Sequence, residues 1–188
     1  MTNRKITKIL IANRGEIALR IIRTAQEMGI STVAVYSETD VVAPHVLAAD
    51  EAVCLGPGPS SESYLLSDKV LQAAIDTGAN GIHPGYGFLS ENAEFAECVE
   101  KAGIAFIGPG TKAIKTMGDK LQAKEAVKAR NIPLVPGTDG AITDSKEALQ
   151  EAHRIGMPLI IKASAGGGGK GMRSVFEIED VEEELTRA

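Results

Sequence analysis

Short apolar runs and amphipathic segments alternate along the first part of the chain. Residues 8–12 (KILIA) are typical of a buried strand, and residues 16–29 carry apolar side chains at helical spacing. Gly29 then provides a helix stop. One buried helix face is predicted at Ile17, Ala18, Ile21, Ile22, Ala25 and Met28.

The same alternation continues as far as residue 109. Ser90 is a candidate N-cap for the last helix of the series. Strands that alternate with helices of about 10–15 residues predict a parallel sheet covered on both faces. The expected fold class is therefore α/β, with an open parallel-sheet, Rossmann-like first domain. The predicted strands are 32–37, 51–56, 79–84 and 104–109, and the predicted helices are 64–78 and 90–103.

The pattern changes after Gly110. Residues 111–131 predict a helical segment broken near Gly118, and the Pro/Gly-rich stretch 132–140 predicts a boundary. One helix and two strands follow, which make only half a layer, so we expect the beginning of a second domain. These later elements are predicted at 145–156, 158–164 and 172–178, with an acidic helical start at 179–188.

Residues 160–172 (IIKASAGGGGKGM) place four consecutive glycines between two predicted strands. Glycine lets other atoms approach the main chain, and runs of backbone N–H groups bind phosphate oxygens. A Walker A loop is excluded, because Gly171 follows Lys170 where serine or threonine is required. A dinucleotide fingerprint is weak, since a strand and not a helix follows the G-x-G-x-x-G match at Gly166, Gly168 and Gly171.

The remaining interpretation is a glycine flap that joins two antiparallel strands over nucleotide phosphates. Lys162, on the incoming strand, could then reach the phosphates. The alternative is a hairpin tip without a ligand, although one or two glycines suffice for a tight hairpin turn.

Composition narrows the function classes. The net charge is −5, without a basic block, which argues against nucleic acid as a partner. No apolar run approaches the roughly 20 residues that cross a bilayer, so we expect a cytoplasmic protein without a membrane span. Cys54 and Cys98 lack metal-ligand spacing, and we expect buried, reduced thiols.

Five segments, in this order, closely resemble the biotin carboxylase component of biotin-dependent carboxylases, a member of the ATP-grasp superfamily. They are KILIANRGEIALRIIRTAQEMGI, HPGYGFLSEN, FIGP, MGDK and IIKASAGGGGKGM. The resemblance covers essentially all 188 residues. It implies that residues 1–117 form the N-terminal Rossmann-like domain and that residues 118–188 begin the ATP-grasp domain with its phosphate loop.

Members of this family use MgATP and bicarbonate to make carboxyphosphate. They then transfer the carboxyl group to biotin on a carrier domain or protein, which delivers it to a carboxyltransferase component. By resemblance, ATP would be bound by Lys120, Lys162, Gly168, Gly169 and Met172. Lys170 stands where the family often has a basic residue and is a further candidate for a phosphate contact. The family has a glycine where this chain has Ala165. The added methyl group of the alanine could limit how far the glycine loop opens.

The resemblance also implies that Tyr86 would flank biotin, with Gly85 and Gly87 giving it room. We interpret His83 as a hydrogen-bonded turn residue. The turn at Gly15 and the acidic Glu38 resemble parts of a nucleotide-binding Rossmann domain, but are interpreted as scaffold.

Arg23 and Glu27 lie four residues apart on the polar face of the first predicted helix. Family members place such residues at a dimer contact, so a homodimer is a hypothesis. The family's magnesium ligands and catalytic groups lie in a later region, and we expect no catalytic or metal-binding residue in these 188 residues and no turnover by this polypeptide alone.

Other functions stay open at this stage. The chain could be a non-catalytic dimerisation or docking module, another ATP-grasp ligase of the carbamoyl-phosphate synthetase type, or a dehydrogenase. The segment HPGYGFLSEN argues against the carbamoyl-phosphate synthetase type, which resembles it only loosely. A titration with NADH would test the dehydrogenase alternative. The family suggests a place in fatty acid synthesis, but these residues do not distinguish acetyl-CoA, propionyl-CoA, pyruvate or urea as the acyl acceptor.

Overall fold

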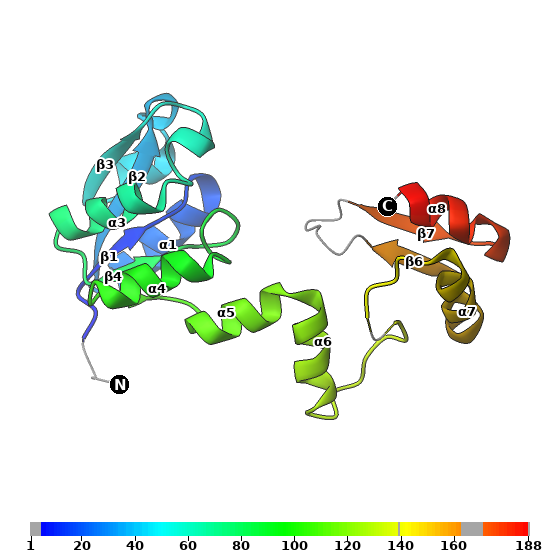
Figure 1. The fold of residues 1–188 in the computed structure, drawn as a ribbon. Helices are drawn as coiled ribbons and strands as arrows, with labels where there is room; N and C mark the ends of the chain where they lie inside the picture. The colour runs from blue at the N-terminus through cyan, green and yellow to red at the C-terminus, as the bar shows by residue number, and fades with distance from the viewer. Residues whose placement is uncertain (1–4, 139, 163–170, 188) are drawn as a thin grey trace. The chain divides into compact units, whose positions relative to one another are not determined.

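The structure is a computed structural model that describes residues 5–138, 140–162 and 171–187, without the side chains of Lys120 and Leu121. The chain divides after Gly118 into two compact units, residues 1–118 and 119–188 (Figure 1). The Pro/Gly-rich stretch 132–140, expected to be a boundary, therefore lies inside the second unit.

A parallel sheet forms the centre of the first unit, in the strand order β3-β2-β1-β4-β5. The central strand β1 pairs with β2 on one side and with β4 on the other, so that Ile9 lies beside both Thr32 and Gly81. The strands are β1 (Lys8–Ile11), β2 (Ser31–Ser37), β3 (Glu51–Gly56), β4 (Gly81–His83) and β5 (Ala105–Phe106).

Helices cover both faces of this sheet because successive side chains of a strand point to opposite faces. Ile9 and Ile11 of β1 belong to a core cluster with Ile22 of α1, whereas Leu10 belongs to the cluster formed with α3 and α4. The expected α/β class with a covered parallel sheet is confirmed. The helices of this unit are α1 (Gly15–Glu27), α2 (Pro44–Ala48), α3 (Ser67–Asp76), α4 (Ala93–Lys101) and α5 (Thr111–Gly118), with 3₁₀ turns η1 (Glu38–Asp40) and η2 (Ser60–Glu62).

Two sequence-based expectations about exposure were wrong. Met28 is 69% exposed, because it lies beyond the last turn of α1 that packs on the sheet. Both cysteines are exposed: Cys54 lies on β3, an edge strand, and Cys98 lies on the outer side of α4. Neither thiol contributes to the core.

The N-cap of α4 is Asn92 and not Ser90. The Asn92 side chain accepts a hydrogen bond of 2.9 Å from the backbone N–H of Phe95. We expect Asn92→Ala to lower the free energy of unfolding by about 1 kcal/mol, since the N–H loses its partner. Ser90→Ala is the matched control and should change it little. Urea denaturation of the chain checks both, and equal losses would contradict the assignment.

The second unit contains an antiparallel strand pair, β6 (Leu159–Lys162) and β7 (Met172–Val175). Its helices are α6 (Lys120–Lys128), α7 (Ser145–Ile155) and α8 (Val181–Arg187), with a 3₁₀ turn η3 (Ile178–Asp180). A small core joins α7, β7 and α8 through Ala148, Ala152, Val175 and Val181. Within the described part of the chain, no helix has the length and apolar character needed to span a bilayer.

Candidate functional site

The carboxyl ends of β1 and β4 mark the point where the strand order reverses. The chain continues from β1 to β2 on one side of the sheet, whereas β4 lies on the other side. In open α/β sheets, ligands bind in the crevice at such a switch point. A hollow of about 300 Å³ lies there, lined by Asn13, Arg14, Glu16, Ile17, Tyr86, Gly87 and Phe88.

Asn13 ties the turn after β4 to the end of β1. Its amide Nδ2 donates to the carbonyl oxygens of Pro84 (2.8 Å) and Tyr86 (2.7 Å), and only 4% of the residue is exposed. Gly85 and Gly87 both have φ of +65°, which favours glycine. The two glycines therefore allow the left-handed backbone of this turn, and the buried Asn13 amide fixes it.

The Tyr86 side chain, one of the residues expected near biotin, is 59% exposed at this hollow. Its hydroxyl donates to the carboxylate of Glu16, and this bond raises the pKa of Tyr86. A Cβ atom added to Gly87 would meet nothing within 4 Å, so this glycine leaves open space. Gly85 differs, because its Cβ would lie 2.8 Å from Asn13 Nδ2.

His83 ends β4 and is part of the same turn. Its Nδ1 accepts a hydrogen bond of 3.0 Å from the backbone N–H of Gly85, which confirms the interpretation as a hydrogen-bonded turn residue. Burial lowers the pKa of His83, which favours the neutral ring that can accept this bond.

Tyr64 lies behind the hollow and is 1% exposed. Burial, together with its bond to the Asp40 carboxylate, raises the pKa of Tyr64 to about 12. Above pH 10 the unfolded chain releases this proton before the folded chain does, so the free energy of unfolding falls as the pH rises toward 12. We expect a loss of about 1 kcal/mol between pH 9 and pH 11.

Urea denaturation at several pH values measures this slope. In Tyr64→Phe the free energy of unfolding should fall by about 1 kcal/mol less between pH 9 and pH 11, because the titrating hydroxyl is gone. The same slope in both proteins would contradict the assignment.

The predicted phosphate-binding residues lie in the second unit. Lys162 ends β6 and pairs with Met172 at the start of β7. Both side chains are exposed, whereas Leu159 and Ile161 pack against the core. The face of the hairpin that is not covered by the core thus carries an ammonium group next to the apolar Ile160 and Met172.

Several other predicted residues are not described. Gly168, Gly169 and Lys170 lie outside the described residues, as does Ala165. Lys120 begins α6, but its side chain is not described. The structure therefore brings together Lys162 and Met172, and leaves the other predicted phosphate contacts as expectations.

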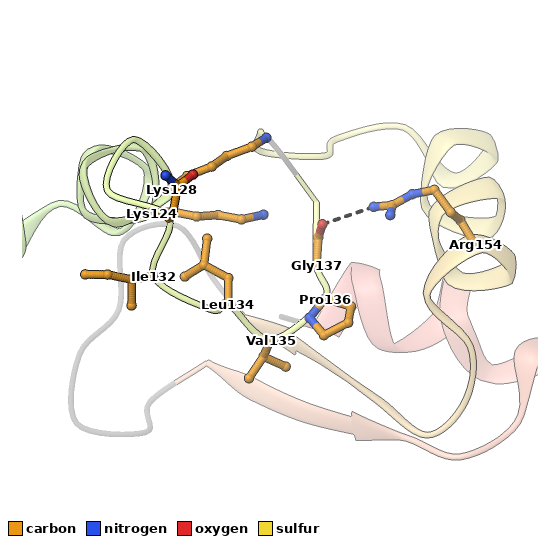
Figure 2. Close-up of a pocket in the computed structure, with 9 residues that line it drawn as sticks. Lys124, Lys128, Ile132, Leu134, Val135, Pro136, Gly137 and Arg154 are labelled. Atoms are coloured by element: carbon orange, nitrogen blue, oxygen red, sulfur yellow. Dashed lines mark hydrogen bonds between the residues drawn. The ribbon is translucent and has the colours of Figure 1, made fainter.

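A second hollow, of about 460 Å³, lies between α6, residues 131–137 and α7 (Figure 2). Its basic side chains are engaged with the protein. Arg154 donates to the carbonyl oxygen of Gly137 at 3.0 Å and pairs with Glu151, and Lys124 donates to the carbonyl oxygen of Thr138. We interpret these bonds as fastening the 131–138 segment to the two helices.

Sequence reasoning missed the residues that shape the hollow of the first unit. Asn13, Arg14 and Glu16 were interpreted only as scaffold around Gly15, and Tyr64 only as the start of a helix. The signal available was the position of Asn13 and Arg14 directly after the first strand, where loops of parallel sheets meet ligands.

Comparison with known proteins decides the family. Residues 5–114, more than half of the chain, match the family described as biotin carboxylase, N-terminal domain. The chain belongs to the biotin carboxylase family. Residues 119–188 of this biotin carboxylase family member match the carbamoyl-phosphate synthase L chain, ATP binding domain.

The biotin carboxylase of Allochromatium vinosum is 58% identical over 171 residues, which are 90% of this chain and 38% of that protein. The mitochondrial propionyl-CoA carboxylase alpha chain of Sus scrofa is 55% identical over 173 residues, which are 92% of this chain and 24% of the relative.

A crystal structure of the biotin carboxylase domain dimer of Hydrogenobacter thermophilus 2-oxoglutarate carboxylase, with MgADP and bicarbonate, gives a TM-score of 0.87 at 48% identity. It covers 98% of this chain and 40% of the solved chain. This biotin carboxylase family member therefore spans between 24% and 40% of the lengths of these proteins.

Proposed function

We propose that the chain provides the N-terminal domain and the phosphate-binding hairpin of an ATP-dependent biotin carboxylase, a ligase that carboxylates carrier-bound biotin with bicarbonate. The observation that supports this most is the match of residues 5–114 to the N-terminal domain family, together with the hollow at the switch point that contains Tyr86. The same match favours this activity over a carbamoyl-phosphate synthetase, although residues 119–188 match that ATP-binding domain.

The exposed face of the β6–β7 hairpin fits a nucleotide. A phosphate tail requires a cation and an adenine ring requires apolar surface, and Lys162 lies beside Ile160 and Met172 on that face. We assign phosphate contacts to Lys162, Lys120, Gly168 and Gly169, and a base contact to Met172. MgATP would supply the phosphoryl group that activates bicarbonate.

The residues of this chain would act by electrostatic positioning. The Lys162 ammonium would stabilise negative charge that spreads over phosphate oxygens, and backbone N–H groups of the glycine segment would do the same. The described residues contain no group of three or more His, Cys, Asp or Glu that could hold a metal ion.

In the first unit, we assign Tyr86 and Gly87 to the vicinity of biotin. Tyr86 offers an exposed ring at the hollow, and Gly87 leaves space beside it. The Glu16 carboxylate holds the tyrosine hydroxyl and so orients the ring.

The proposed partners are a biotin carboxyl carrier domain or protein and a carboxyltransferase component. A homodimer through Arg23 and Glu27 is proposed as well, because both side chains are exposed on α1 and a related domain was solved as a dimer. A cytoplasmic location and a place in fatty acid synthesis belong to the same proposal, although relatives include mitochondrial propionyl-CoA carboxylase alpha chains.

Incorporation of labelled bicarbonate into free biotin, with MgATP and the complete protein, tests the proposed function. ATP-dependent carboxybiotin is the expected product. No incorporation by the complete folded protein, or formation of carbamoyl phosphate when ammonia replaces biotin, would overturn the proposal.

A further inference from the structure

Tyr64 touches two walls of the switch-point hollow without lining it. Its hydroxyl is fixed from two sides, since it accepts a hydrogen bond of 2.9 Å from the Ser37 N–H and donates one of 2.5 Å to Asp40 Oδ2. These bonds come from the end of β2 and from η1. The hydroxyl is therefore held by residues that follow β2, and β2 and β4 lie on opposite sides of β1 in the sheet.

The ring of Tyr64 stacks flat on the ring of Phe88, with centroids 5.3 Å apart and planes 4° from parallel. Phe88 has φ of +42°, a left-handed conformation that is rare for a bulky residue and costs energy. Such a conformation persists only where the surroundings hold it. The stack on a rigid, buried tyrosine supplies that constraint.

Tyr64 also contacts the opposite wall. The guanidinium carbon of Arg14 lies 5.7 Å from the Tyr64 ring centroid, and Arg14 forms an ion pair of 3.3 Å with the same Asp40 oxygen that accepts the Tyr64 hydroxyl. Arg14 and Phe88 both line the hollow with Tyr86. One buried side chain thus connects the loops that follow β1, β2 and β4.

We propose that Tyr64 is a positioning residue, which holds Phe88 in its left-handed conformation and thereby fixes the 85–88 turn that presents Tyr86 to the hollow. The role of Tyr86 toward biotin rests on the proposed function, whereas the control of the turn by Tyr64 does not. A plain core aromatic would stabilise the first unit as a whole. A positioning residue stabilises this turn more than the rest.

Amide hydrogen exchange measured by NMR on the 188-residue chain separates the two roles. Tyr64→Leu removes the ring and the hydroxyl. It should speed exchange at Gly85 and Ser90, whose N–H groups are hydrogen-bonded in this turn, by about ten-fold more than at β1 amides. Phe88→Leu removes only the stack and should act on the same amides. The double variant should add little to Tyr64→Leu, because that change already breaks the stack.

Two further variants keep the test decisive if Tyr64→Leu does not fold. Tyr64→Phe retains the stacked ring and loses the hydroxyl bonds, so exchange at the turn should rise less than in Phe88→Leu. Tyr36→Phe, a hydroxyl deletion on β2, is the matched control and should leave the turn unchanged. Exchange that rises uniformly through residues 5–118, or additive effects of Tyr64 and Phe88, would overturn the proposal.

Biotin carboxylation by the complete protein gives a second readout. Phe88→Leu should raise the KM for biotin by about ten-fold with the KM for ATP unchanged, because only the turn loosens, and Tyr64→Phe, which keeps the stacked ring, should raise it less. An equal rise in both KM values would overturn the positioning role. If the complete native protein carboxylates no biotin, the proposed function fails, and the exchange experiment still decides the role of Tyr64.

Discussion

Replacing Lys162 by methionine is expected to weaken MgATP binding by about 10- to 100-fold, because a hydrogen bond to a charged phosphate contributes about 1.5–3 kcal/mol. Lys162 lies on the exposed face of the hairpin, directly before the glycine segment, so no rearrangement of the core is needed for it to reach a ligand. Methionine keeps an unbranched side chain of nearly the same length and removes the ammonium group. Isothermal titration calorimetry with the complete protein measures the change.

Lys146→Met is the control for this prediction, since Lys146 is an exposed lysine on α7 of the same unit. Its removal should leave MgATP affinity unchanged. Adenosine, which lacks phosphates, should bind the native protein and Lys162→Met alike. Equal losses for adenosine and MgATP would show that Lys162 acts on the fold of the hairpin and not on the phosphates.

Gly85→Ala is expected to lower the free energy of unfolding of the first unit by about 2–4 kcal/mol. An L-residue at φ of +65° costs about 1–2 kcal/mol. The added methyl would also lie 2.8 Å from Asn13 Nδ2, whose two bonds fasten the turn to β1 and contribute about 1 kcal/mol each. The backbone strain at position 85 and the displacement of the Asn13 amide therefore both lower the free energy of unfolding.

Gly87→Ala provides a matched comparison, because Gly87 has the same φ but open space around its Cβ position. It should cost about 1 kcal/mol, from the backbone strain alone. Urea denaturation followed by tyrosine fluorescence reports on this unit, since the chain has no Trp and its tyrosines, Tyr36, Tyr64 and Tyr86, all lie there. Equal costs at the two glycines would contradict the role given to Asn13.

The parallel sheet could be predicted from sequence because its signals are local. Residues 9–12 and 33–35 are uninterrupted apolar runs, as strands buried on both faces require, and both lie in interior strands of the sheet, β1 and β2. The antiparallel hairpin around the glycine segment was predicted in the same way, and β6 pairs with β7 as expected. Local patterns thus define most elements and the fold class.

Relationships between distant residues could not be predicted. Tyr64 was placed at the start of a helix, but α3 begins at Ser67, and Tyr64 packs on Phe88 and bonds to Asp40, both 24 residues away along the chain. Nothing in a periodic pattern indicates such a contact, because it depends on which loops meet at one end of the sheet. The Asn13 bonds to the turn after β4 were missed for the same reason.

The candidate site shows a similar division. Tyr86 and Lys162 were identified through segments that resemble a known family, and the structure places both on accessible surfaces. Arg14 and Glu16, which line the hollow with Tyr86, were not identified as site residues, because their role depends on the strand order and not on their own neighbours in sequence.

The position of β3 at the edge of the sheet has a practical consequence for handling and labelling the protein. Its Cys54 thiol and that of Cys98 are open to solvent, so maleimide dyes or spin labels can be attached to the native sequence without engineering new sites. Purification under reducing conditions would prevent these two groups from cross-linking molecules.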